Sequence, residues 1–124
     1  MSNTKPMPTE INLHKQSGVL EVSFDTDETF SLTAEYLRTH SPSAEVQGHG
    51  PGQEVLQIGK EKVLIEAIEP VGNYAILIHF DDGHNTGIFA WDTLYRLGKD
   101  HGTLWPNYLA RLEAAGHKRK APNA

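Results

Sequence analysis

The sequence predicts a small β-rich α+β domain, in which five to seven short strands form antiparallel hairpins beside two or three short helices. Apolar and polar residues alternate in several short runs, and glycine-containing turns separate these runs. Helical spacing of apolar residues is confined to a few short stretches. At 124 residues, the chain has the length of one domain with a modest core.

The first third of the chain predicts an arm, a hairpin and a helix. Residues 1–9 contain two prolines and no periodicity, so we expect a flexible arm. Apolar residues alternate over 11–13 and 20–24 on either side of a Ser-Gly turn, which is the pattern of a β-hairpin. A return strand at 30–32 leads into a helix over 34–40, which a threonine can cap and which ends before a proline.

The middle of the chain predicts a long loop and then further strands. Residues 41–54 contain three glycines and two prolines, and loops of this length are usually functional or disordered. Strands are expected at 54–58 and 62–69. The run 73–80 places apolar residues on both faces, which favours a central strand. Asp82-Gly83 then predicts a hairpin turn before a strand at 86–89.

Two helices are predicted near the C-terminal end, over 91–97 with Gly98 as its stop and over 104–115. We therefore expect a single domain over 10–116 and a disordered basic tail over 117–124. Trp105 is a better candidate than the other tryptophan for an exposed interface anchor.

A faint internal echo joins the two halves of the chain. The segments 22–37 and 78–94 both have the order strand, acidic turn, strand and helix start. Two units related by a pseudo-twofold axis would produce such an echo, and so would chance.

Charge and composition argue against several classes of function. The net charge is −5, and with three bases of the tail set aside the body is more acidic still, which disfavours binding to nucleic acid. No apolar run approaches the length of a membrane span, and the N-terminus lacks the pattern of a signal peptide, so we expect a cytoplasmic protein. The absence of cysteine excludes disulfides and thiolate metal ligands from this chain.

Several motifs occur in an order that resembles a known family. An apolar strand at 20–24 is followed by Tyr36-Leu37-Arg38, by EPVGNYAI at 69–76 and by FDDGHNTGIFAW at 80–91. Over about residues 8–98 the chain looks like the gamma-butyrobetaine hydroxylase N-terminal-like domain, and like its stand-alone bacterial members in particular. This resemblance implies a β-rich module that is also found fused to carnitine-pathway oxygenases and to P-loop iron–sulfur carrier ATPases.

The resemblance also implies a zinc site that this chain has lost. In the hydroxylases a C-x-C-x-x-C run and a histidine hold zinc, and these positions fall on Ser41, Ser43, Val46 and His84. Serine and valine do not serve as zinc ligands, so we expect the structural zinc of the Cys3His type to be absent. The oxygenase domain is absent from the sequence too, and we expect no enzymatic activity.

Two hypotheses for function remain. The first is a non-catalytic adaptor that acts through the 41–53 loop and the 81–87 turn and serves iron–sulfur carrier machinery or another metal-linked pathway. Homo-oligomerisation is also open. The loop residues that we expect to bind the partner are Ser41, Ser43, Glu45, Gln47, His49 and Gln53.

The alternative is a small iron- or zinc-binding protein, with or without enzymatic activity, in which His84 pairs with His49 or His40. In the simpler interpretation these histidines only cap turns and bind loop carbonyls. A hydrolytic triad from a loop serine, a histidine and an aspartate has little support, because no G-x-S-x-G motif is present.

Overall fold

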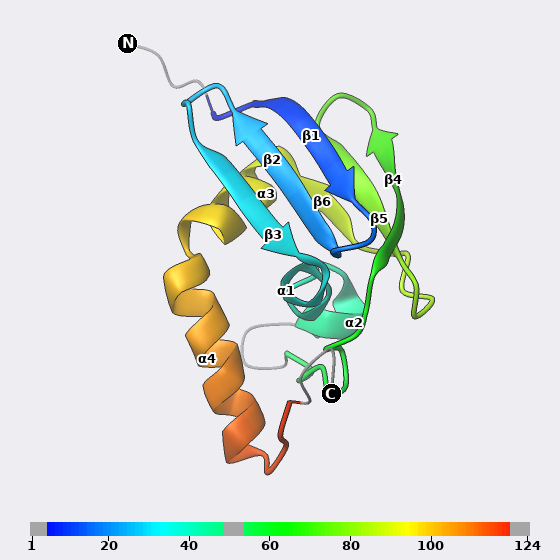
Figure 1. Ribbon diagram of the computed structural model, residues 1–124, viewed down its shortest axis with the longest axis vertical. Helices are drawn as coiled ribbons and strands as arrows, with labels where there is room; N and C mark the ends of the chain where they lie inside the picture. Colours follow the sequence, from blue (N-terminus) through cyan, green and yellow to red (C-terminus); the bar gives the residue numbers. More distant parts are fainter. Residues whose placement is uncertain (1–4, 49–53, 120–124) are drawn as a thin grey trace.

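Two three-stranded antiparallel sheets form the body of the protein. The computed structural model describes residues 5–48 and 54–119, without the side chains of residues 44 and 45. The first sheet has the order β1 (Pro8–His14), β2 (Val19–Phe24), β3 (Thr29–Thr33), and the second has the order β4 (Ile65–Val71), β5 (Ala75–Phe80), β6 (Ile88–Ala90). The two sheets lie one in front of the other (Figure 1). The α+β class with short antiparallel strands is therefore confirmed.

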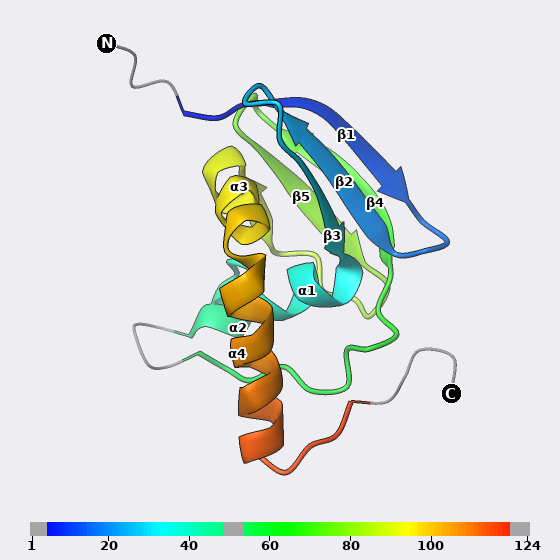
Figure 2. The same cartoon turned by 60° about the vertical axis from the view of Figure 1, so that its left-hand side comes forward.

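Four helices complete the described chain: α1 (Ala34–Thr39), α2 (Ala44–Gln47), α3 (Trp91–Lys99) and α4 (His101–Ala114). The short helices α1 and α2 lie at one end of the sheets, and α4 passes beside them and extends beyond the strands (Figure 2). None of the helices within the described ranges is long and apolar enough to cross a membrane.

The core lies between the two sheets because each sheet turns one apolar face inward. In β2 the residues Leu20, Val22 and Phe24 are almost fully buried, and in β5 Ile76, Ile78 and Phe80 are buried as well. Burial of each such side chain contributes about 1.5–3 kcal/mol. As predicted for a central strand, β5 pairs with a neighbour on each side.

The order of elements recurs in the two halves. In each half an antiparallel three-stranded meander leads directly into a helix, because Thr33 precedes α1 and Ala90 precedes α3. The echo between 22–37 and 78–94 covers the last two strands and the helix of each half. The sequence echo therefore coincides with a repeated strand–strand–helix order.

Several predicted boundaries in the first two thirds of the chain are wrong. The expected arm is shorter, because β1 begins at Pro8 and Met7 exchanges hydrogen bonds with Asp25. The predicted loop contains the one-turn helix α2. Residues 54–58 are not a strand: Val55 N–H donates to Val46 O, and the Val55 and Ile58 side chains are exposed. Their apolar spacing suggested a strand, but none of the strands in the described part of the chain pairs with them.

The C-terminal helices also differ from prediction. Helix α3 continues through Gly98, where a Cβ atom would clash with the ring of Phe30. This glycine therefore permits close packing of α3 on β3 and does not end the helix. Helix α4 begins at His101, three residues early, so Pro106 lies inside it and not in its first turn.

The connection between β5 and β6 is longer than a two-residue hairpin. Gly83 has a φ of 89° and donates its N–H to Phe80 O, so the expected tight turn is present. Phe80 N–H then donates to His84 O, and β6 starts only at Ile88, two residues after the predicted strand start. The extra residues carry His84 inward.

Candidate functional site

Two segments far apart in sequence meet at His84. Ser41 and Ser43 follow α1, and His84 comes from the β5–β6 connection. His84 Nε2 lies 3.0 Å from Ser41 Oγ and 3.2 Å from Ser43 Oγ. Ser41 is fully buried, and His84 is only 4% exposed. The structure thus brings the start of the 41–53 loop and the 81–87 turn together.

The cluster is closely packed. The two serine hydroxyls are also within hydrogen-bond distance of each other, at 3.4 Å. A Cβ atom at Gly87 would clash with Ser41 Oγ, so glycine is required for this approach. Among the described residues, every buried side-chain nitrogen or oxygen has a hydrogen-bond partner. These polar side chains therefore satisfy one another inside the protein, as buried polar groups must.

An ion pair braces the same junction from outside. Arg38, on α1, donates from Nε to Asp82 Oδ2 at 2.9 Å, and Lys60 Nζ donates to the same oxygen at 2.9 Å. The His84 backbone N–H donates to Asp82 Oδ1 at 3.1 Å. Burial opposes ionisation of Asp82, but these hydrogen bonds outweigh it and lower the pKa of the carboxyl to about 2. Asp82 therefore remains charged at neutral pH.

The residues at the implied zinc positions do not fit zinc. Two positions offer neutral hydroxyls, Val46 offers an alkyl group, and His84 Nε2 already faces both hydroxyls. Structural zinc sites take four ligands from thiolates, imidazoles and carboxylates. At Ser41, Ser43 and His84, three of the positions at which the resemblance implies zinc ligands, this chain has a hydrogen-bonded cluster.

The same geometry disfavours a hydrolytic triad. Asp82 accepts a hydrogen bond from the His84 backbone, so this bond does not orient the imidazole ring as a triad aspartate would. The Ser41 hydroxyl has no exposure to solvent through which a substrate could approach.

His40 belongs to a different environment. Its Nδ1 lies 2.9 Å from Tyr36 O at the end of α1, and its ring contacts those of Tyr36 and Tyr108. Burial lowers the pKa of His40, which favours the neutral ring. Within residues 5–48 and 54–119, no three His, Asp or Glu side chains are grouped to hold a metal. His49, Gln53 and the Glu45 side chain lie outside what the structure describes.

A cavity of about 280 Å³ adjoins His40 and was not anticipated. Gln47, which was predicted to bind a partner, lies at its wall, and its side chain donates to Ser41 O at 2.9 Å. Arg96 and Arg111 from α3 and α4 line the other side. No feature of the sequence indicated that these arginines and α2 would line one cavity.

Comparisons with known proteins agree with this two-sheet fold. The family model for the gamma-butyrobetaine hydroxylase-like N-terminal domain matches residues 11–95. The chain belongs to this family, which confirms the resemblance drawn from the motifs. A comparison with curated proteins gives no match.

Solved structures extend the agreement over nearly the whole chain. Two structures solved by NMR in solution are both 48% identical to this chain, with TM-scores of 0.81 and 0.80. They cover 96% and 98% of this chain, and the matches span 93% and 90% of their own chains. A crystal structure of a protein of unknown function in the DUF971 family, from Acidithiobacillus ferrooxidans, is 40% identical with a TM-score of 0.64. It covers 77% of this chain and 98% of its own.

Proposed function

We propose that this protein is a non-catalytic binding module that recognises a protein partner in the cytoplasm. Its docking surface is the outer side of the junction between the 41–53 loop and the 81–87 turn. The observation that supports this proposal is the contact of Ser41 and Ser43 with His84, which holds the two segments in one fixed surface. A surface that is fixed before binding loses less entropy when a partner docks.

Exposed side chains, most of them polar, surround the buried cluster. Pro42 and Gln47 are exposed on the first segment, and Asp81, Asn85 and Thr86 are exposed on the second. Asp82 and Arg38 brace the two segments from the side. The cluster therefore supplies rigidity, and the surrounding residues supply the groups that a partner would contact.

For the partner we propose iron–sulfur carrier machinery, and specifically a P-loop carrier ATPase. The support is family membership together with the resemblance to modules fused to such ATPases. In this proposal the module contributes recognition only, because His84 Nε2 already faces two hydroxyls and the implied zinc positions carry no thiolate.

The test compares two variants that each add one positive charge to an exposed position. Asn85→Arg alters the proposed docking surface, whereas Ser31→Arg alters the exposed side of β3. Binding to an iron–sulfur carrier ATPase is measured by isothermal titration calorimetry. Asn85→Arg should bind at least tenfold more weakly than the wild type, which is a loss of about 1.4 kcal/mol or more of binding free energy. Ser31→Arg should bind as tightly as the wild type. Absence of binding by the wild-type protein, or equal affinity of both variants, would overturn the proposal.

A further inference from the structure

A second site lies on another face of the molecule, where the end of the described chain returns to α1. Arg119 Nε donates to Glu35 Oε2 at 2.7 Å, and Arg119 Nη2 donates to Glu35 Oε1. The two residues are 84 positions apart. The contact ties residues 117–119 of the predicted tail to the domain, while 120–124 lie outside the described residues.

The receptor for Arg119 has the chemistry of a guanidinium pocket. Glu35 accepts through both carboxylate oxygens, which is the geometry that matches the planar fork of arginine. Arg119 Cζ lies 5.4 Å from the ring centroid of Trp105, so the cation also faces an aromatic surface. The hydrogen bonds to Glu35 raise the pKa of Arg119, and the negative charges of Glu35 and Glu61 add to this effect.

Glu35 is a buried charge that depends on this partner. Its side chain is 8% exposed, whereas the Arg119 side chain is 29% exposed. A buried carboxylate that loses its partner is costly, so the pocket favours another cation whenever Arg119 leaves. Glu35 belongs to helix α1 of the folded domain, whereas Arg119 lies close to the end of the described chain.

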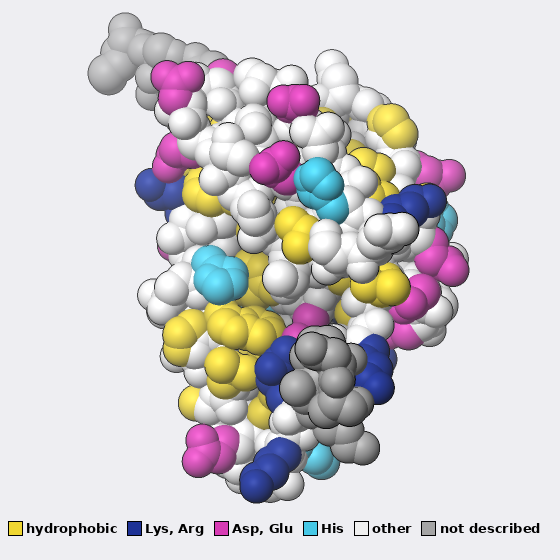
Figure 3. Space-filling model, viewed as in Figure 1, with side chains coloured by type: hydrophobic (Ala, Val, Ile, Leu, Met, Phe, Trp, Pro, Cys, Tyr) yellow, Lys and Arg dark blue, Asp and Glu magenta, His cyan; other side chains and the backbone are white. Residues whose placement is uncertain are grey.

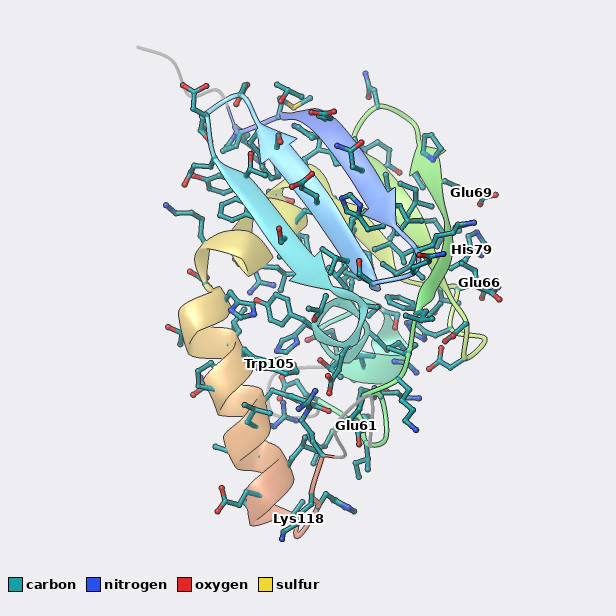
Figure 4. All side chains as sticks on the ribbon, viewed as in Figure 1. Glu61, Glu66, Glu69, His79, Trp105 and Lys118 are labelled. Carbon is teal, nitrogen blue, oxygen red and sulfur yellow. The ribbon has the colours of Figure 1, made fainter. Side chains whose placement is uncertain are left out.

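The surrounding hollow is larger than one guanidinium requires. It has a volume of about 590 Å³ and is bounded by the β1–β2 turn, the start of α1, residues 61–64 and α4. Leu64 is exposed there, and Trp105 lines the same hollow. Figure 3 shows hydrophobic side chains gathered over α4 with Lys and Arg side chains beside them. Figure 4 labels Trp105 on α4, Glu61 on the segment before β4, and Lys118 near the end of the chain.

We propose that the pocket formed by Glu35, Glu61 and Trp105 is a recognition site for an arginine side chain of a partner protein, and that Arg119 is its intramolecular competitor. The apolar wall at Leu64 then accommodates the residues beside that arginine in the partner. This site is separate from the junction at His84 and does not depend on the function proposed there.

The experiment empties the pocket and adds a minimal ligand. Arg119→Ala, in the full chain, is titrated with N-acetyl-arginine amide, and the Trp105 indole N–H is followed by NMR. The protein has two tryptophans, so Trp91→Phe assigns the signal. We expect a saturable shift in Arg119→Ala and weaker binding in the wild type, because the tethered Arg119 side chain competes for the pocket at an effective concentration of about millimolar. Lys118→Ala is the matched control and should behave like the wild type.

Specificity is tested with N-acetyl-lysine amide and with Glu35→Gln. Lysine cannot donate bidentately, and glutamine lacks the charge, so both changes should weaken binding to Arg119→Ala by about tenfold or more. If Glu35→Gln does not fold, Glu61→Gln replaces it, with a smaller expected loss of binding affinity. A chain that ends at Lys118 is a second way to empty the pocket. No saturable Trp105 shift, or equal binding of the lysine compound, would overturn the proposal. So would a wild-type dimer that Arg119→Ala dissociates, because the occupant would then be the tail of a second copy.

Discussion

Ser41 Oγ lies 3.0 Å from His84 Nε2, although the two residues are 43 positions apart in the sequence. This contact joins the segment after α1 to the β5–β6 connection, at positions where the family resemblance implies zinc ligands. In this chain a buried hydrogen-bonded cluster occupies the junction, and the implied zinc positions carry two serines and a valine.

The cluster should contribute to stability. His84→Ala removes the shared partner of two buried hydroxyls, and each unsatisfied group costs about 1–3 kcal/mol. We expect the free energy of unfolding in urea to fall by several kcal/mol. The control His14→Ala removes an exposed histidine that lies 3.7 Å from Glu21, and a pair of this kind contributes about 0–1 kcal/mol. Equal, small losses in the two variants would contradict a structural role for His84.

Restoring three thiolates should restore zinc binding. In the variant with Ser41→Cys, Ser43→Cys and Val46→Cys, the imidazole of His84 already faces the first two positions. Metal analysis should find one zinc per chain and a higher melting temperature, since structural zinc contributes about 10–16 kcal/mol in small zinc-binding peptides. Adding His84→Ala should remove most of the bound zinc. Zinc that is unaffected by this change would mean that the three positions do not converge on His84.

The Asp82 brace predicts a specific dependence of stability on pH. Its pKa is lowered from 3.8 to about 2 in the folded protein, so the unfolded chain binds the proton more readily. The stabilisation is therefore fully present above about pH 4 and is lost as pH falls towards 2. Urea unfolding of the wild type and Asp82→Asn should give a difference that is constant from pH 5 to 7 and shrinks below pH 4. A difference that stays constant down to pH 2 would show that the charge of Asp82 is not involved.

Replacement of glycine by alanine should have opposite effects on stability at two helical positions, Gly98 and Gly102. Alanine is more favourable than glycine in a helix, by about 1 kcal/mol in its interior and by less near its ends, where both glycines lie. At Gly102 a Cβ atom meets open space, so Gly102→Ala should leave stability unchanged or raise it. At Gly98 it clashes with Phe30, and overpacking of this kind costs about 1–3 kcal/mol. Gly98→Ala should therefore lower the melting temperature; if both substitutions stabilise, the close packing of α3 on β3 is wrong.

The sequence predicted those parts of the fold in which local pattern and tertiary packing agree. The hairpin around Gly18 and the central position of β5 follow from alternation of apolar residues along each strand. Residues 54–58 have a strand-like pattern, but within the ranges that the structure describes no strand pairs with them, which a local pattern cannot reveal. Gly98 resembled a helix stop because its reason, the ring of Phe30, lies far away in the sequence.

The candidate site, too, could be predicted from the sequence only in part. The family resemblance identified Ser41, Ser43 and His84 as positions of one site, and the structure brings them together. It could not indicate Arg96 and Arg111, because their convergence on one cavity depends on how α3 and α4 pack. Nor could it pair Glu35 with Arg119, since the tail has no periodicity from which its path could be predicted.

In our proposal, His84 maintains a recognition surface and does not hold a metal ion. The sharpest check is metal analysis of the wild-type protein and of His84→Ala after anaerobic purification. We expect iron and zinc well below one ion per chain in both proteins. One ion per chain in the wild type that is lost in His84→Ala would show that His84 is a metal ligand.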